Sequence, residues 1–320
     1  MLDRLILHVG PPKTGSKAIQ QGFDGNREKF RSSGILYPSG MWHGQLASWA
    51  QLSNPSSTYN VWSQRRDPDK IKRSDDEYVK SLLSEITESG CRIAILSYEG
   101  FSVLSEEELE RVRQLFAPVA KSIHALVYIR HPVSWAKSEL STRALHGLAP
   151  KSPGELSRKY SSILTRIFRV LGKESLVARE FDRRTLYRGS TFLDAVSICD
   201  KVIAEQFLND DSNDDLINPS LSLEAYQVAL HLSRELSQHG SRQRKQRFEK
   251  FLRNFEGEPL KLTPSELAGV SKIAEREILF LSRELGFEFS PQTAFESRRP
   301  RDGLRPKQSR AIAEALKSVI

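Results

Sequence analysis

Short apolar runs alternate with longer amphipathic segments through roughly the first 190 residues. The apolar runs predict strands at 5–9, 35–37, 92–97, 122–129 and 175–178. The amphipathic segments predict helices at about 16–31, 75–89, 105–116 and 155–171, and from residue 132 onward. Strands that alternate with helices indicate an α/β fold, with a parallel sheet flanked by helices on both faces. From about residue 190 the pattern is mainly helical.

Two of the predicted helices begin with capping signals. Ser105 with Glu108 forms a capping box, and Thr263-Pro264-Ser265-Glu266 combines a cap, a proline at the first helical position and a glutamate at the third. The stretch 54–74 is polar and contains several prolines and serines, so it is expected to be a loop or an insertion.

The first predicted strand ends at Gly10 and leads into a turn suited to phosphate. The turn continues as Pro12-Lys13-Thr14-Gly15-Ser16, and a helix is expected to follow. Unpaired N–H groups and the helix dipole favour an anion there, and Lys13 adds a full positive charge. It is not a Walker A loop, because Gly15 is followed by Ser16 and then Lys17, with no lysine directly after the glycine. The alternative is an ordinary strand-to-helix turn with a surface lysine.

A second polar junction follows the strand predicted at 122–129. Arg130 leaves the carboxyl end of that strand, where open parallel sheets bind ligands, and Pro132 suits the first turn of a helix. Ser138 lies about two helical turns further on. A guanidinium can hold a phosphate through two hydrogen bonds, and a hydroxyl can add a third. Taken singly, the arginine could serve in a salt bridge and the serine on a solvated helix face. Together with the Lys13 turn they indicate a phosphate site.

These two segments resemble the sulfotransferases that use 3′-phosphoadenosine 5′-phosphosulfate (PAPS). In that family Pro-Lys-Thr-Gly-Ser/Thr forms the 5′-phosphosulfate loop, and a strand ending in Arg-x-Pro with a later serine forms the 3′-phosphate site. The nearest resemblance is to bacterial sulfotransferases that act on carbohydrate. It implies that the cofactor is held by Pro12, Lys13, Thr14, Gly15, Ser16, Lys17, Arg130 and Ser138.

The resemblance covers about residues 3–290 and includes the segments 34–38, 96–101 and 218–225. It implies a P-loop-like sulfotransferase domain over 1–295, in which 190–295 is the mainly helical portion, followed by a basic tail over 296–320. Lys17 departs from the family's pattern, which has a small hydroxyl residue at this position. The lysine could supply charge, or point away and leave only its backbone N–H to the ligand.

Sulfuryl transfer requires charge stabilisation on the bridging oxygen and a base for the acceptor. Lys13 is the candidate for the bridging oxygen, and no metal is then required. Two residues compete as the base. His43 follows the second strand in a loop with Trp and Gly, and Glu99 follows the strand at 92–97. Carbohydrate sulfotransferases use either residue type, so the choice stays open. His8, inside the first strand, is expected in the core or behind the site.

The chain has 320 residues and a formal net charge of +8, a balance that attracts anions without choosing among them. Basic stretches at 242–253 and 298–310 show little aromatic interleaving and no nucleic-acid-binding fold, so no nucleic-acid partner is expected. A solvated helix is the first interpretation of 242–253. Contact with an acidic glycan or with the inner face of the membrane is the alternative. The acidic run 210–215 lacks the glycine and glutamate of a calcium loop and is expected on the surface.

Cys91 and Cys199 are the only cysteines, and both are expected to be buried thiols without metal-ligand spacing. No signal-peptide or membrane-spanning pattern is present, so a cytoplasmic location is expected.

The function indicated is transfer of the sulfuryl group from PAPS to a hydroxyl of a carbohydrate or glycolipid, with release of 3′-phosphoadenosine 5′-phosphate (PAP). One alternative is an ATP-dependent small-molecule kinase with an atypical P-loop. Another is an inactive anion-binding scaffold. The sequence names neither the acceptor nor the oligomeric state.

Overall fold

The computed structural model describes residues 1–39, 43–52, 67–149, 151–152, 155–207, 221–230 and 242–290. The chain forms two compact units. The first combines Met1–Arg130 with Tyr160–Leu216, and the second combines His131–Lys159 with Ile217–Ile320.

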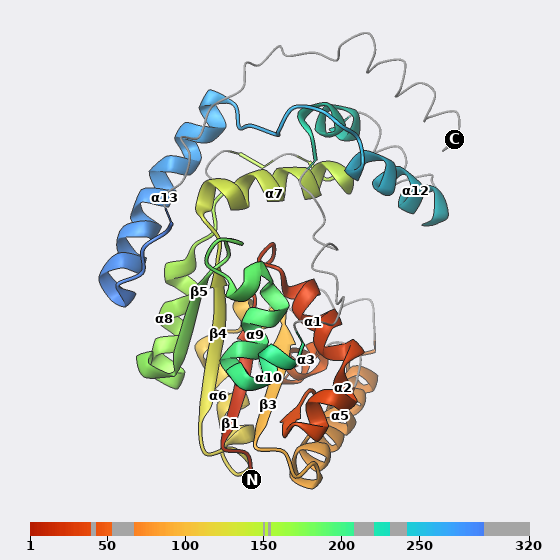
Figure 1. Ribbon diagram of the computed structural model, residues 1–320, viewed down its shortest axis with the longest axis vertical. Coiled ribbons are helices and arrows are strands. Elements are labelled where there is room, and N and C mark those ends of the chain that lie inside the picture. Colours follow the sequence, from red (N-terminus) through yellow and green to blue (C-terminus); the bar gives the residue numbers. More distant parts are fainter. Residues whose placement is uncertain are drawn as a thin grey trace. The chain divides into compact units, whose positions relative to one another are not determined.

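A parallel sheet forms the centre of the first unit (Figure 1). Its strands are β1 (Arg4–Val9), β2 (Ile35–Leu36), β3 (Ile93–Tyr98), β4 (Ile123–Ile129) and β5 (Leu176–Glu180), in the order β2-β3-β1-β4-β5. The central strand β1 pairs with β3 on one side and β4 on the other. The chain therefore leaves β1 toward one edge of the sheet and later returns to the other. Ligands bind at the carboxyl ends of the strands at such a switch point.

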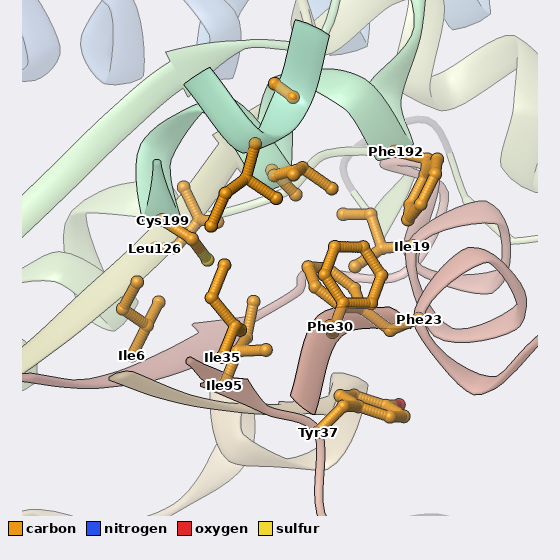
Figure 2. Close-up of a cluster of buried hydrophobic side chains, with 14 of the residues drawn as sticks. Ile6, Ile19, Phe23, Phe30, Ile35, Tyr37, Ile95, Leu126, Phe192 and Cys199 are labelled. Atoms are coloured by element: carbon orange, nitrogen blue, oxygen red, sulfur yellow. The ribbon is translucent and has the colours of Figure 1, made fainter. Parts of the chain in front are cut away.

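One face of the sheet is covered by α1 (Ser16–Gly25), α2 (Arg27–Ser32), α9 (Thr191–Cys199) and α10 (Lys201–Gln206). These helices and the strands share one apolar cluster, seen in Figure 2. Aromatic rings fill much of it, and Phe30 stacks on Phe207 with 4.4 Å between ring centroids. The cluster includes Ile6, Ile19, Phe23, Ile95, Leu126 and Phe192.

The opposite face is covered by α3 (Gly44–Leu52), α5 (Pro68–Glu88), α6 (Glu106–Phe116) and α8 (Tyr160–Leu171). Helix α3 contacts both α5 and α6, α6 contacts α8, and α8 packs on β4. Leu5 and Leu7 are buried and alternate along β1 with Ile6, so they face this second layer. The predicted α/β class, with a parallel sheet flanked by helices on both faces, is confirmed.

Two predicted boundaries are wrong for local reasons. The helix expected over 16–31 is broken at Asn26, whose side-chain amide donates to the Gly22 carbonyl at 2.9 Å. The loop expected over 54–74 is already helical from Pro68. Asp67 caps that helix by accepting the backbone N–H groups of residues 69 and 70, and Pro68 occupies the first helical position. Residues 53–66 lie outside the described part of the chain.

Both predicted capping boxes are confirmed. Ser105 and Glu108 each bond the other's backbone N–H at the start of α6. Thr263 and Glu266 do the same at the start of α13 (Pro264–Leu285). Cys91 and Cys199 are buried free thiols, as expected.

The second unit contains α7 (Pro132–Leu145), α12 (Arg242–Arg253) and α13 around a separate apolar cluster. The basic stretch 242–253 is a helix that buries Phe248 and Leu252 in this cluster, while residues 243–247 are exposed. The acidic run 210–215 and the tail 296–320 lie outside the described residues. In the parts of the chain that the structure describes, no helix is both long and apolar enough to cross a membrane.

Candidate functional site

The turn between β1 and α1 has the backbone geometry of an anion-binding loop. Lys13 and Gly15 adopt left-handed conformations, with φ of 73° and 79°. The buried Thr14 closes the turn by donating from Oγ1 to the Pro11 carbonyl at 2.6 Å. Gly15 is the N-cap of α1, so the first N–H groups of that helix lie at this turn. Alternating backbone conformations of this kind direct successive N–H groups toward an anion.

Both glycines of the turn are required by close neighbours. A β-carbon on Gly15 would lie 2.7 Å from the Phe181 ring and 2.8 Å from Thr191 Cγ2. The segment between β5 and α9 therefore packs directly against the turn. A β-carbon on Gly10 would overlap Ser16 Oγ and lie 3.1 Å from His8 Nε2.

His8 and Ser16 place two unpartnered polar atoms under the turn. The His8 side chain is fully buried, and its Nδ1 lies 2.7 Å from Ser97 Oγ. Among the described residues, His8 Nε2 and Ser16 Oγ are buried and have no hydrogen-bond partner. Burial lowers the pKa of His8 to about 3, so the ring is neutral near pH 7.

Arg130 reaches the turn from the end of β4. Its Nη1 donates to the Lys13 carbonyl at 3.1 Å, and its guanidinium carbon lies 5.4 Å from the centre of the Phe181 ring. Its backbone N–H and carbonyl both bond the Tyr160 hydroxyl, at 3.0 and 2.9 Å. Burial lowers the pKa of Arg130 from its ordinary value. The structure thus brings Arg130 and the Lys13 turn together.

The other predicted cofactor residues differ in exposure. Pro12 and Lys13 are half-buried, and the Lys17 side chain is exposed. Ser138 belongs to the second unit, where it is a half-buried residue of α7. The place of Ser138 in a 3′-phosphate site stays a prediction.

The two candidate bases occupy different environments. His43 is buried, and its Nδ1 accepts the backbone N–H of Ser97 at 2.8 Å. A neutral ring that accepts at Nδ1 carries its hydrogen on Nε2, an atom that is buried and has no hydrogen-bond partner among the described residues. Neither nitrogen is then ready to take a proton. Burial lowers the pKa of His43 to about 4, despite a smaller opposing effect of the Pro38 carbonyl. This geometry favours a structural role for His43.

Glu99 is half-buried at the first position of a 3₁₀ turn (Glu99–Val103). The preceding residue, Tyr98, pairs with Val9 at the end of β1. Gly10 and Glu99 therefore follow directly on two paired residues, so they lie at the same end of the sheet, where the strands have their carboxyl ends. Of the two candidates, Glu99 has the better position to act as a base.

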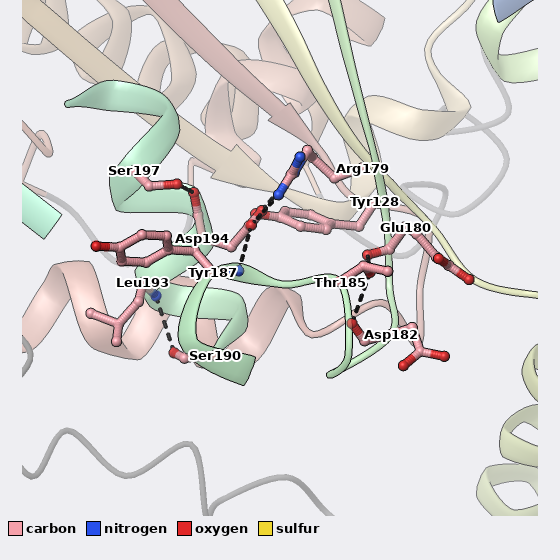
Figure 3. Close-up of polar contacts among 10 residues, drawn as sticks. All are labelled: Tyr128, Arg179, Glu180, Asp182, Thr185, Tyr187, Ser190, Leu193, Asp194 and Ser197. Carbon is pink, nitrogen blue, oxygen red and sulfur yellow. Dashed lines mark hydrogen bonds and ion pairs between the residues drawn. The ribbon is translucent and has the colours of Figure 1, made fainter. Parts of the chain in front are cut away.

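A buried ionic cluster holds the segment that packs against Gly15 (Figure 3). Asp194 is fully buried on α9. Its Oδ1 accepts from Arg179 Nη2 at 2.6 Å and from the Tyr187 N–H at 2.9 Å. Its Oδ2 accepts from the Tyr128 hydroxyl at 2.9 Å and from Arg179 Nε at 3.1 Å. Asp194 thus ties β4, β5 and α9 together beside the turn.

Sequence reasoning did not single out this cluster, nor Ser97, Phe181 or Thr191. The pairing of these residues depends on contacts between distant segments, such as that between Tyr128 and Asp194, which are 66 positions apart. His8 did carry a local signal, because it is a polar residue at a core-facing position of a buried strand. Among the described residues, no group of three or more His, Cys, Asp or Glu side chains could hold a metal ion.

No family model and no curated protein matches this chain. Among solved structures, a sulfotransferase from Alicyclobacillus acidocaldarius aligns over 90% of this chain and 97% of its own, at 12% identity and a TM-score of 0.43. The sulfotransferase domain of the Synechococcus PCC 7002 olefin synthase aligns over 86% and 94%, at 15% identity and a TM-score of 0.33. The sulfotransferase domain of the curacin biosynthetic pathway aligns over 85% and 97%, at 12% identity and a TM-score of 0.35. TM-scores this low do not establish a shared fold, so the function has to be inferred from the residues of the site.

Proposed function

We propose that this chain is a sulfotransferase that moves the sulfuryl group of PAPS to a hydroxyl of a carbohydrate or glycolipid and releases PAP. The observation that carries the proposal is the hydrogen bond from Arg130 to the Lys13 carbonyl, between segments 117 residues apart in sequence. These are the two segments that resemble the 5′-phosphosulfate and 3′-phosphate sites. Because the two segments meet at the carboxyl ends of β1 and β4, they support a ligand with two separate anionic groups.

The residues of the turn fit such a ligand. Ser16 offers a buried hydroxyl that has no partner among the described residues, and Gly15 lies where the backbone must approach closely. Lys13 belongs to the turn and Arg130 donates to its backbone, so both supply positive charge there. Lys13, Thr14, Gly15 and Ser16 would hold the 5′-phosphosulfate, and Arg130 would hold the 3′-phosphate.

The chain's own residues divide the chemistry between them. PAPS, when bound, supplies the sulfuryl group. Lys13 stabilises the negative charge that develops on the phosphate oxygen as its bond to sulfur breaks and the acceptor oxygen bonds to sulfur. The Glu99 carboxylate takes the proton that the acceptor hydroxyl loses.

The proposal is tested by calorimetric titration of the purified chain with PAP, with ATP and magnesium as the comparison. Micromolar binding of PAP with weak binding of magnesium-ATP is the expected result. A preference for magnesium-ATP would overturn the proposal in favour of a kinase. Binding of neither nucleotide, together with salt-sensitive retention on an anionic polymer, would instead indicate an anion-binding scaffold.

A further inference from the structure

A hydrogen-bonded chain of buried side chains with one open end lies beneath the turn between β1 and α1. His8 and Ser97 are paired neighbours on β1 and β3, so their side chains lie on the same face of the sheet, the face that α1 covers. Ser97 is fixed on both sides of its backbone, by His43 at its N–H and by Gln20 at its carbonyl. The Ser97 hydroxyl is thereby held against His8 Nδ1 at 2.7 Å.

The open end of the chain lies near Ser16. His8 Nε2 and Ser16 Oγ both lie beside the place where a β-carbon on Gly10 would stand. The side chains of His8 and Ser16 are 0% and 2% exposed, and neither atom has a hydrogen-bond partner among the described residues. Two unmet polar atoms in one buried space are costly unless a bound ligand completes their hydrogen bonds.

We propose that His8 is a positioning residue, which orients the Ser16 hydroxyl so that it donates its hydrogen to the phosphosulfate. The inference rests on the proposed function, because it needs an anion on the loop. With the anion bound, the Ser97 hydroxyl donates to His8 Nδ1, His8 Nε2–H donates to Ser16 Oγ in a bond that is not made without the anion, and the Ser16 hydrogen is left for the anion. Every donor in the chain then acts in the same direction, which strengthens each bond.

The anion selects this direction over its reverse. A neutral imidazole has one hydrogen, so Nε2 can either donate to Ser16 or accept from it. If Nε2 accepted, the Ser16 hydrogen would point into the protein and the Ser16 oxygen would face the anion. Gly10 is required by the same arrangement, because a side chain there would occupy the space beside His8 Nε2 and Ser16 Oγ in which this bond has to form.

Two substitutions of His8 distinguish the contribution of Nδ1 from that of Nε2. In His8→Asn the amide can reach Ser97 but not Ser16, and in His8→Gln it can reach Ser16. We expect PAP affinity, measured by calorimetry, to fall about ten-fold in His8→Asn and to stay within about three-fold of the wild type in His8→Gln. Lys80→Ala, an exposed change on α5, is the control. Equal PAP affinity in both variants and the wild type would overturn the inference.

A measurement on the wild-type protein tests the inference even if the His8 variants do not fold. In nitrogen-15 spectra of the imidazole side chains, we expect His8 to carry its hydrogen on Nε2 when PAP is bound. A His8 ring that carries its hydrogen on Nδ1 in the PAP complex would overturn the inference while leaving the proposed function intact. If the wild type fails to bind PAP at all, the proposed function fails first, and the role of His8 falls with it.

Discussion

Two buried polar clusters flank the turn between β1 and α1, and they differ in how completely their hydrogen bonds are made. Around Asp194, both carboxylate oxygens accept two hydrogen bonds each. Around His8, the chain of bonds stops short: His8 Nε2 and Ser16 Oγ have no partner among the residues that the structure describes. Asp194 and Tyr128 are as fully buried as His8 and Ser16, and all four residues lie in the same unit, so burial of these side chains does not explain the difference.

The difference between the two clusters indicates a structural role for the Asp194 cluster and a binding role for His8 and Ser16. A completed network in a low-dielectric interior fixes the elements that it joins, and Asp194 joins strands and a helix beside Gly15. A buried polar atom without a partner costs about 1–3 kcal/mol, which a ligand can recover. The Asp194 cluster therefore holds the loop in place, and the His8–Ser16 pair is left for the ligand.

The largest expected effect is on stability, from Asp194→Ala. The change leaves the buried Tyr128 hydroxyl and the Tyr187 N–H without an acceptor and takes the carboxylate from the partly exposed Arg179, so the free energy of unfolding should fall by about 3–5 kcal/mol. Urea unfolding measures it. Asp3→Ala, which breaks a surface pairing with Arg92 and Lys121, should have a much smaller effect. Similar losses in the two variants would contradict the anchoring role.

Lys13→Ala should impair the reaction far more than the fold. We expect turnover to fall about 10²–10³-fold, because charge on the leaving oxygen loses its cation. PAP affinity should fall less, since the backbone of the loop remains. Lys80→Ala removes the same charge from an exposed site on α5 and serves as the control. Retained turnover in Lys13→Ala would remove the lysine from the bridging oxygen.

Glu99→Gln and His43→Phe should show which residue is the catalytic base and which one stabilises the fold. In Glu99→Gln, turnover should fall by about 10² or more with PAP affinity unchanged. In His43→Phe, the buried Ser97 N–H loses its acceptor, so stability should fall by about 1–3 kcal/mol while the folded enzyme turns over. Steady-state kinetics and urea unfolding measure the two effects. The reverse pattern would make His43 the base.

The two buried histidines should make the stability of the fold depend on pH. Burial lowers the pKa of His8 to about 3 and of His43 to about 4, from an ordinary 6.5. The unfolded chain takes up protons below pH 6.5 that the folded chain does not, so stability should fall as pH drops from there toward 4. Each histidine contributes about 1.4 kcal/mol per pH unit. In His43→Phe, the slope of the free energy of unfolding against pH should decrease by the contribution of one proton. An unchanged slope would contradict the lowered pKa of His43.

The sequence predicts those features whose causes are local. The capping boxes at Ser105 and Thr263 were predictable, because each is complete within four residues. The strand before Gly10 and the strand before Arg130 were predictable from their apolar runs. The start of α5 was missed although Asp67-Pro68 is a local signal, because the surrounding polar residues resemble a loop.

The features that depend on distant partners were not predictable. Asp194 lies in a helix of ordinary composition, and its role appears only when Tyr128 and Arg179 come beside it. His43 has the residue type and neighbours of a base, but Ser97, 54 residues away, engages its Nδ1. His8 could be placed in the core, but the sequence does not show that Ser16 is near it, because the turn at Gly10 brings the two residues to the same place.

The central claim is that the Lys13 loop and Arg130 together bind the two phosphates of one nucleotide. Calorimetry with PAP and with adenosine 5′-monophosphate, in the wild type and in Arg130→Ala, tests it most directly. Arg92→Ala, at the opposite end of the sheet, is the control. We expect PAP to bind the wild type about ten-fold or more tightly than the monophosphate, and the preference to be lost in Arg130→Ala alone. An equal preference in the wild type and Arg130→Ala would contradict the claim.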